Sequence, residues 1–377
     1  MKKVGTITTA VGLLALGIAL LVHSINPGVE WLSNPIKWWP LLLIGLGIEI
    51  LVKRIRTEDK DMKIDPLIVV FFLGILAAGC YNLMKTEIVD SGVLGWKNQS
   101  THHYLEQAAL NGVKQISVES LRGEVVLRQS TDGKVKAETD LSLRSNRKIV
   151  FPNNLLSISQ EGDKIVIREQ GSELPSYFHQ INTRTVIYLP PIIPVSIESV
   201  DQLDGGNISN PLTVSDVSDL ELSDLASGLN VNSDSGQIVV RNARGKVQVN
   251  SNDGQIRLYN IPAGVQLAID SGNIDLSEVY GKIDVTSDSG NVNLRNIKAP
   301  NADCHIRNHE GNIDLSSGQL TDCRLMAVVG EGNLVMPQWI SVPNNQASES
   351  IKTVNYTFGK GNKSIELLID QGTITVR

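Results

Sequence analysis

The sequence has few cysteines, few aromatic residues and no excess of basic charge. Its 377 residues include three cysteines, and aromatic side chains make up 5% of the chain. Three cysteines do not make a disulfide framework, and none of them lies in a CxxC pair that would indicate a structural zinc site. Lysine and arginine number 34 against 40 aspartate and glutamate, a net charge of −6. This balance disfavours a general nucleic-acid-binding protein, which would carry a basic face.

Signatures of catalysis are also missing from the sequence. It contains no HExxH, no GxSxG and no GxxxxGK[ST] motif. Residues 359–364 (GKGNKS) have the composition of a phosphate-binding loop without its spacing, and we predict a β-hairpin turn there. An enzyme acting on a polysaccharide would need carboxylates that converge on a cleft, whereas the charges here are spread over turns and outer faces. The sequence therefore predicts neither an enzyme nor a bound cofactor.

What the sequence does contain, first, is three apolar runs within residues 1–84. The run at 4–22 is long enough for a helix to cross a hydrocarbon core about 30 Å thick. A signal peptide is the rival interpretation, but it would have a shorter apolar core followed by a small-residue cleavage site. The run at 38–52 is short, so a full span and a re-entrant hairpin both stay open. We predict a transmembrane region with helices at about 4–22, 38–52 and 66–84.

Basic residues flank these runs asymmetrically. Lys2 and Lys3 precede the first run, and a KRIR cluster at 53–56 follows the second. The positive-inside rule then places the N-terminus in the cytoplasm, and three spans place everything after residue 84 outside the cell. Residues 85–112 are predicted to form an extracellular stalk. We expect Glu49 to be a carboxylate at the membrane interface, with a polar contact to a partner helix as the alternative.

The stretch 225–338 repeats itself with a period of 18 and then 21 residues. Each copy holds two short runs of alternating apolar and polar residues, such as 247–249 and 256–258, and this alternation is typical of β-strands. A polar corner between the runs ends in glycine, which enters left-handed backbone conformations without steric cost. The structural corner glycines are Gly236, Gly254, Gly272, Gly290, Gly311 and Gly332.

An amide follows every corner glycine, which predicts a ladder of hydrogen bonds between copies. These amides are Gln237, Gln255, Asn273, Asn291, Asn312 and Asn333. One copy cannot bury its apolar face alone, whereas stacked copies can. The predicted fold class is therefore N-terminal transmembrane α-helices followed by an all-β domain over 113–377. That domain is expected to be a β-solenoid with two strands per 18–21-residue coil. Regular coils span 225–338, irregular capping strands lie at both ends, and 364–370 and 373–377 supply the last strands.

Acidic residues recur at the same corner, two positions before the glycine. Asp234, Asp270 and Asp288 share this column, and 18 is twice the nonapeptide period of calcium-binding β-rolls. The GGxGxD element of such rolls is absent, however, and Asn252 and His309 interrupt the column. Asparagine and aspartate also satisfy the backbone of turns. Turn chemistry is therefore favoured over calcium, and we predict no metal site.

The cysteines and one histidine pair leave alternatives open. Cys304 and Cys323 are expected to point inward on neighbouring coils as buried free thiols, with a disulfide as the alternative. Cys80 ends a lipobox-like LAAGC, but it lies behind two other apolar runs, which favours a membrane-buried cysteine over a lipidated one. His102 and His103 fall in the predicted stalk, where solvated side chains are favoured over a metal or pH-sensing role.

The segment WWPLLLIGLGIEIL followed by KRIR resembles the membrane region of LiaF-type envelope-stress proteins of Gram-positive bacteria. The YLP at 188–190, the DGGNIS at 204–209 and the recurrent DSGNI corners resemble the DUF4097 family, also called Toastrack, which carries an adhesin label. The resemblance implies a membrane-anchored cell-envelope protein, without enzymatic activity, that senses or modulates envelope stress through contacts with a membrane histidine kinase or another envelope protein. The alternative is an adhesin-like or structural surface module that binds cell-wall polymer or another solenoid.

Overall fold

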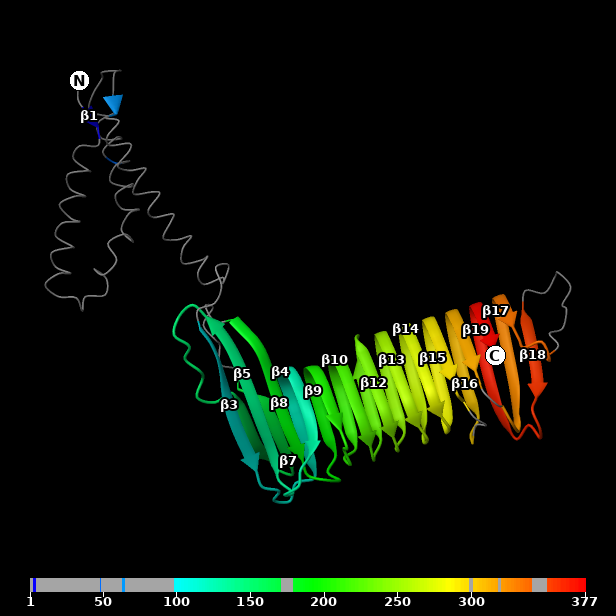
Figure 1. Ribbon diagram of the computed structural model, residues 1–377, viewed down its shortest axis with the longest axis horizontal. Coiled ribbons are helices and arrows are strands. Elements are labelled where there is room, and N and C mark those ends of the chain that lie inside the picture. Colours follow the sequence, from blue (N-terminus) through cyan, green and yellow to red (C-terminus); the bar gives the residue numbers. More distant parts are fainter. Residues whose placement is uncertain are drawn as a thin grey trace. The chain divides into compact units, whose positions relative to one another are not determined.

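The computed structural model describes residues 3–4, 48, 63–64, 98–170, 179–297, 301–317, 320–340 and 351–377 (Figure 1). The predicted helices at 4–22, 38–52 and 66–84 lie almost entirely outside these residues, as do Glu49 and Cys80. In the described part of the chain, no helix has the length and apolar character needed to cross a membrane. Two short strands near the N-terminus, β1 (Lys3–Val4) and β2 (Lys63–Ile64), pair in parallel.

From residue 98 onward the described chain is an all-β domain. It begins with six strands whose pairing is partly parallel and partly antiparallel. These are β3 (Asn98–Ala108), β4 (Gln115–Gln129), β5 (Val135–Ser145), β6 (Leu156–Glu161), β7 (Lys164–Glu169) and β8 (His179–Leu189). Strand β4 pairs in parallel with β7, β8 and β9, while β5 pairs with β8 and β6 with β7 in antiparallel fashion. The irregular pairing ends where the repeated coils begin.

The sequence predicts a stalk at 85–112, but the structure places residues 98–108 of this range in strand β3. It pairs with β5, and its Tyr104 is buried. The two histidines of β3 have definite contacts as well. The ring of His102 stacks on that of Phe151 with centroids 5.1 Å apart, and His103 Nδ1 lies 2.8 Å from a carboxylate oxygen of Asp140. These two histidines are exposed, but they belong to a β-sheet.

The remaining strands form a stack of coils, seen side by side in Figure 1. They are β9 (Val195–Gly206), β10 (Leu212–Leu225), β11 (Leu229–Ser233), β12 (Gln237–Ala243), β13 (Val247–Ile261), β14 (Gly264–Val279), β15 (Lys282–Arg295), β16 (Cys304–Ser316), β17 (Cys323–Val335), β18 (Lys352–Thr357) and β19 (Lys363–Val376). All of the pairings from β9 to β16 within this stack are parallel.

The register of these pairings equals the period of the sequence. Val247 of β13 pairs with Val265 of β14, so residues 18 apart lie side by side. Val285 pairs with Ile306, a step of 21 residues. Because the offset is constant along each strand, most inward-facing apolar residues meet an apolar residue of the next coil, whereas Ile269 lies between Ser251 and Ser287. The inward positions fuse into one continuous core, in which the side chains are almost completely buried.

The strands continue further than the alternating pattern predicts. Two strands per coil are present as β11 and β12, but β13, β14, β15 and β16 each run unbroken through the corner. The reason is that the corner residues also pair from coil to coil. Gly254 pairs with Gly272, and Gly272 with Gly290. The backbone bends at the glycine without losing its hydrogen-bonded partners in the neighbouring coils.

The order of the last coils differs from the order of the repeats. We expected the copy at 318–338 to stack directly on the copy at 297–317, with the C-terminal strands beyond it. Instead β19 lies between β16 and β17, and it pairs in parallel with both (Figure 1). Gly372 of β19 takes the position of a corner glycine between Gly311 and Gly332. The sequence predicts two strands here, at 364–370 and 373–377, whereas β19 runs unbroken through Gly372.

Strand β18 lies on the other side of β17, with which it pairs in antiparallel fashion. The turn at 359–362 therefore leads from one edge of β17 to the other, and does not join two adjacent strands of a simple hairpin. Two backbone amides of this turn are held by Asp322, since Lys360 N donates to its carboxylate at 3.0 Å and Asn362 N to its carbonyl at 3.0 Å. The predicted hairpin at 359–364 is thus replaced by a crossing connection.

The position of β19 also separates the two cysteines. Cys304 pairs with Ile365 of β19, and Cys323 pairs with Lys363, so the expectation of neighbouring coils was wrong. Both thiols are free and buried. Burial raises the pKa of the Cys304 thiol to about 11, which disfavours the reactive thiolate.

Candidate functional site: the polar ladders of the coil stack

The corner glycines bring successive coils into the closest backbone contact of the stack. Gly272 has a φ of 129° and Gly290 a φ of 119°, values that side-chain-bearing residues rarely adopt. A Cβ atom added to Gly272 would lie 1.9 Å from the carbonyl oxygen of Gly254. A column of this kind admits only glycine, and it therefore sets where the polar side chains beside it emerge from the stack.

A second column of left-handed residues lies at the opposite bend, and the sequence interpretation missed it. Its members share φ values between 53° and 60°, and they are Asp224, Asn242, Asn260, Glu278 and Asn296. Asparagine and aspartate enter this conformation more readily than other residues with a side chain. Asn242 Nδ2 donates to Asp224 Oδ1 at 2.9 Å, and Asn260 Nδ2 donates to Asn242 Oδ1 at 3.0 Å. Recurrence of Asn and Asp at a spacing of 18 was the available signal.

The amides after the corner glycines form the expected ladder at Asn273, Asn291 and Asn312. Asn291 Nδ2 donates to Asn273 Oδ1 at 2.9 Å, and Asn312 Nδ2 donates to Asn291 Oδ1 at 2.8 Å. Asn291 uses one donor and one acceptor within the ladder, and keeps a second N–H and a lone pair for other partners. The ladder therefore stabilises the stack and still presents hydrogen-bonding groups outward.

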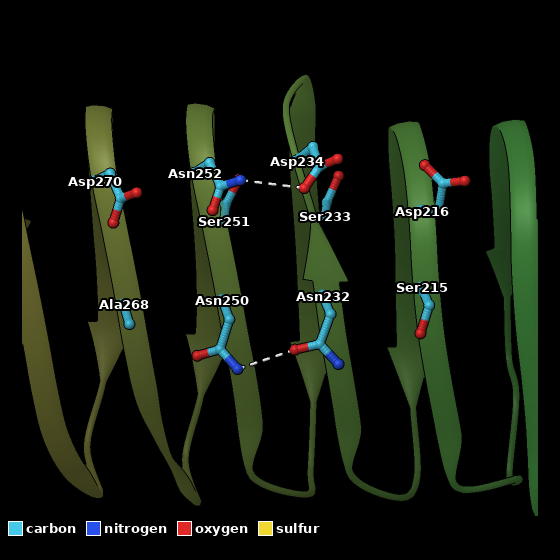
Figure 2. Close-up of a pocket in the computed structure, with 10 residues that line it drawn as sticks. All are labelled: Ser215, Asp216, Asn232, Ser233, Asp234, Asn250, Ser251, Asn252, Ala268 and Asp270. Atoms are coloured by element: carbon cyan, nitrogen blue, oxygen red, sulfur yellow. Dashed lines mark hydrogen bonds between the residues drawn. The ribbon is translucent and has the colours of Figure 1, made fainter.

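A separate pair of polar rows lines an open groove of about 520 Å³ (Figure 2). Its lining residues come from successive coils, and they are Ser215, Asp216, Asn232, Ser233, Asp234, Asn250, Ser251, Asn252, Ala268 and Asp270. Asn250 Nδ2 donates to Asn232 Oδ1 at 2.9 Å, and Asn252 Nδ2 donates to Asp234 Oδ1 at 3.1 Å. Figure 2 shows these bonds running from one coil to the next. The groove thus offers amides and carboxylates at the strand spacing of about 4.8 Å.

A second groove, of about 570 Å³, follows the column of left-handed asparagines. Its polar lining includes Asn207, Asp224, Asn242, Arg244 and Asn260. Neither groove has a histidine or a cysteine among its described lining residues. Both are suited to hydrogen bonding with an extended ligand. In the first groove the Ser233 and Ser251 hydroxyls donate to backbone carbonyl groups.

The column of acidic residues two positions before the corner glycines also contains residues that are not acidic, as the sequence indicated. Asn252 stands between Asp234 and Asp270, so these two carboxylates are two coils apart. His309 follows Asp288 in the same column, and its Nδ1 lies 2.8 Å from Asp370 Oδ2. Over the ranges that the structure describes, no group of three or more His, Cys, Asp or Glu side chains is placed to hold a metal ion.

We therefore expect calcium to leave the stability of the β-domain unchanged. The melting temperature of a fragment spanning residues 98–377 should be nearly the same in EDTA and in millimolar calcium. A site filled at about 100 times its dissociation constant would add about 2.7 kcal/mol. Asp270→Asn provides the control. A rise of several degrees with calcium that disappears in this variant would show that the acidic column is a calcium site.

Taken together, the stacked coils, the glycine corners and the amide ladders define a repeat-built, all-β module with polar flanks. Residues 113–377 match the family model of Toastrack DUF4097, and the chain belongs to this family. Residues 8–94 match the model of the LiaF transmembrane domain, which implies that the protein is anchored in a membrane. The two matches together indicate a membrane-associated envelope protein.

Two crystal structures are similar to the β-domain. One is a provisionally named cell adhesion protein from Clostridium sporogenes, 15% identical, with a TM-score of 0.23, covering 74% of this chain and 99% of that chain. The other is a provisionally named adhesin from Bacteroides fragilis, 16% identical, with a TM-score of 0.36, covering 74% of this chain and 98% of that chain. A search of curated proteins found no match.

Proposed function

We propose that this protein is a non-enzymatic sensor or modulator of envelope-stress signalling that acts through protein contacts. The observation that carries the proposal is the union, in one chain, of a LiaF-type membrane segment with a stack of polar ladders. The membrane segment links the chain to the bilayer, where a membrane histidine kinase or another envelope protein can be contacted. The ladders supply an extended, regular surface on which an envelope component can be bound.

The proposed topology follows from charge. Residues 4–22, 38–52 and 66–84 form the membrane helices, with the N-terminus in the cytoplasm because basic residues flank them on that side. The β-domain is then a β-solenoid on the outer face of the membrane. In this arrangement the solenoid is exposed to the cell wall and the helices are exposed to neighbouring membrane proteins. Sensing and transmission are assigned to different parts of the chain.

The helices are suited to transmission. Lipid gives no hydrophobic drive to helix association, so contacts there depend on packing of small residues and on polar groups worth about 0.6–2 kcal/mol each. The sequence provides Gly74 with Ala78, and Ala15 with Ala19, at the spacing that permits close packing. Glu49 adds a polar group near the inner boundary.

A surface module that binds wall polymer, or another solenoid, is the second candidate function. The groove of Figure 2 favours it, because its amides repeat at every coil and could follow a linear polymer for several repeats. The charge of the groove narrows the choice of polymer. Asp216, Asp234 and Asp270 would repel a phosphate-rich chain and would attract amino groups. A polymer with hydroxyl, amide and amino groups fits this lining best.

The decisive experiment separates the two parts of the chain. Residues 1–84 should retain crosslinking to a membrane histidine kinase, while deletion of residues 98–377 should abolish the response to envelope damage. The physical reason is that the helices hold the partner and the ladders receive the signal. The measurements are crosslinking in intact cells, and a stress-promoter reporter in a strain that lacks the chromosomal copy.

The opposite distribution would contradict the sensor proposal. If the isolated β-domain restores normal reporter control, the membrane region is an anchor only, and the surface-binding function becomes the better one. A matched variant, Asn232→Ala with Asn250→Ala, removes one ladder pair from the groove. It should weaken the reporter response, whereas Gln248→Ala, an exposed amide on the same coil, should leave it unchanged.

A further inference from the structure

The C-terminal strand β19 occupies a place that the repeat assigns to β17. Gly332 and Asn333 of β17 stand 21 residues after Gly311 and Asn312 of β16, which is the period of this part of the repeat. In the structure, Gly311 pairs with Gly372 of β19, and Gly372 pairs with Gly332. If β17 paired directly with β16 at this 21-residue offset, each corner glycine would again lie beside a corner glycine.

The core positions agree with this equivalence. Ile306 of β16 pairs with Leu367 of β19, and Leu367 pairs with Ala327 of β17. All three side chains are buried and apolar. If β19 were removed and β17 moved up to β16 in the same register, Ala327 would lie directly beside Ile306, and an apolar pair would again face the core. Strand β17 thus has two suitable parallel neighbours, β16 and β19.

The charged contacts of β19 within the described residues all run to β16. His305 Nδ1 lies 3.0 Å from Glu366 Oε2, and His309 Nδ1 lies 2.8 Å from Asp370 Oδ2. A third ion pair joins Arg377 to Asp314 of β16. All of these groups are at least partly exposed, so each pair alone contributes little. Their concentration on one edge of β19 makes that edge sensitive to the charge of His309.

Carboxylates face both histidines from two sides. His305 pairs in register with Asp284 of β15, and Asp284 is itself bound by Lys282 at 2.9 Å. On its other side His305 meets Glu366 of β19. Asp303 lies near His305 as well, beside Lys363.

His309 has the more acidic surroundings. Asp370 of β19 accepts its hydrogen bond and is the main cause that raises the pKa of His309, and Glu310 and Asp288 add to the effect. A histidine whose folded-state pKa is raised stabilises the folded form fully below its unfolded pKa of about 6.5. That contribution is lost as the pH rises through the raised value. The attachment of β19 to β16 should therefore strengthen in mild acid and weaken in alkali.

We propose that β19 is a removable strand. It occupies a slot between β16 and β17. When β19 leaves, β17 closes this slot by pairing directly with β16. The His309–Asp370 pair holds β19 in the slot more firmly in acid than in alkali. The device gives the domain two states that differ in which strand lies beside β16, and it places the trigger at the C-terminal end of the coil stack.

The closed slot can be trapped by a disulfide in the full chain. With β19 in place, positions 304 and 325 are two strand spacings apart, about 10 Å, and a disulfide needs Cα atoms within about 7 Å. With β19 out, they become direct neighbours at about 4.8 Å. The test chain carries Leu325→Cys to pair with Cys304, and Cys323→Ser to remove the other buried thiol. Formation of the disulfide under a mild oxidant is measured by mass spectrometry.

Release of β19 is then induced in two independent ways. Gly372→Val would place a Cβ atom 1.8 Å from the carbonyl oxygen of Gly311, and deletion of residues 362–377 removes the strand. We expect at least a tenfold faster disulfide formation in either background. The control replaces Leu325→Cys with Met326→Cys, which lies on the other face of β17 and should not react with Cys304. Failure of both backgrounds to accelerate the disulfide would overturn the proposal.

The histidine latch has its own measurement. Hydrogen exchange of the β19 amides, corrected for the intrinsic dependence on pH, should be severalfold slower at about pH 5.5 than at about pH 8. His309→Gln should remove this difference. His103→Gln, which alters a similar histidine–aspartate pair far along the chain, should leave it intact. An equal pH dependence in all three chains would show that His309 does not hold β19.

Discussion

Gly272→Val should lower the free energy of unfolding of the 98–377 fragment by about 2–6 kcal/mol. Two costs combine at this position. A β-branched residue at a φ of 129° is strained, and its Cβ would lie 1.9 Å from the carbonyl oxygen of Gly254. That oxygen belongs to the next coil, so relief of the clash requires the coils to move apart. The measurement is chemical denaturation followed by circular dichroism.

Ser271→Ala is the matched control for this glycine. The Ser271 hydroxyl donates to Asp253 Oδ1 at 3.0 Å on the exposed side of the same corner. Loss of an exposed hydrogen bond changes stability by about 0.5 kcal/mol or less. Equal effects of the two substitutions would mean that the corner tolerates a side chain, and that the glycine column does not hold the coils together.

Leu258→Ala should destabilise the same fragment by about 2–5 kcal/mol, as buried leucine truncations do. Leu258 is completely buried in β13, in register with Val240 of β12 and Leu276 of β14. The cavity left by the leucine side chain would lie between the two neighbouring coils. The rigid backbone ladder there limits how far the surrounding atoms can move in to fill it. Chemical denaturation again measures the loss, together with the denaturant dependence of the transition.

Tyr259→Ala tests the alternation directly, because it removes a larger side chain from the next position. Tyr259 points outward, is 36% exposed and has the Arg241 guanidinium 5.8 Å from its ring centre. An exposed cation–π contact contributes about 0.5–1 kcal/mol. A larger loss for Tyr259→Ala than for Leu258→Ala would contradict the assignment of inward and outward faces.

The regular coils were predictable because they depend on local repetition. Alternation in 247–249 and 256–258 determines which side chains point inward, and the 18-residue period determines which of them meet. The glycine at each corner is recognisable for a steric reason that holds for any sequence. The ladder of Asn273, Asn291 and Asn312 follows from the same period, since equal side chains at equal heights can exchange hydrogen bonds.

The grooves were harder to foresee than the ladders that border them. Asp234 and Asp270 were recognised as a column, but the second row of the groove, with Asn232 and Asn250, was not, since these residues belong to the preceding run. The groove is bordered by two rows of side chains, and each coil contributes a residue to each row. It forms only because these residues line up from coil to coil. The left-handed column at Asn242 and Asn260 was not predicted, because asparagine and aspartate occur in turns of many kinds and do not by themselves mark a left-handed residue.

What the sequence by itself determined is the coil: its period, its inward face, its glycine corner and the amides beside it. These features rest on steric and hydrophobic preferences that act within about twenty residues. Only the tertiary structure decided the order of the coils at the C-terminal end, the joining of β3 to the sheet and the separation of Cys304 from Cys323. Strands that share one register are interchangeable neighbours as far as local pattern is concerned. The structure joins β19 to β16 through contacts between distant segments, and the two histidine–carboxylate pairs are among them.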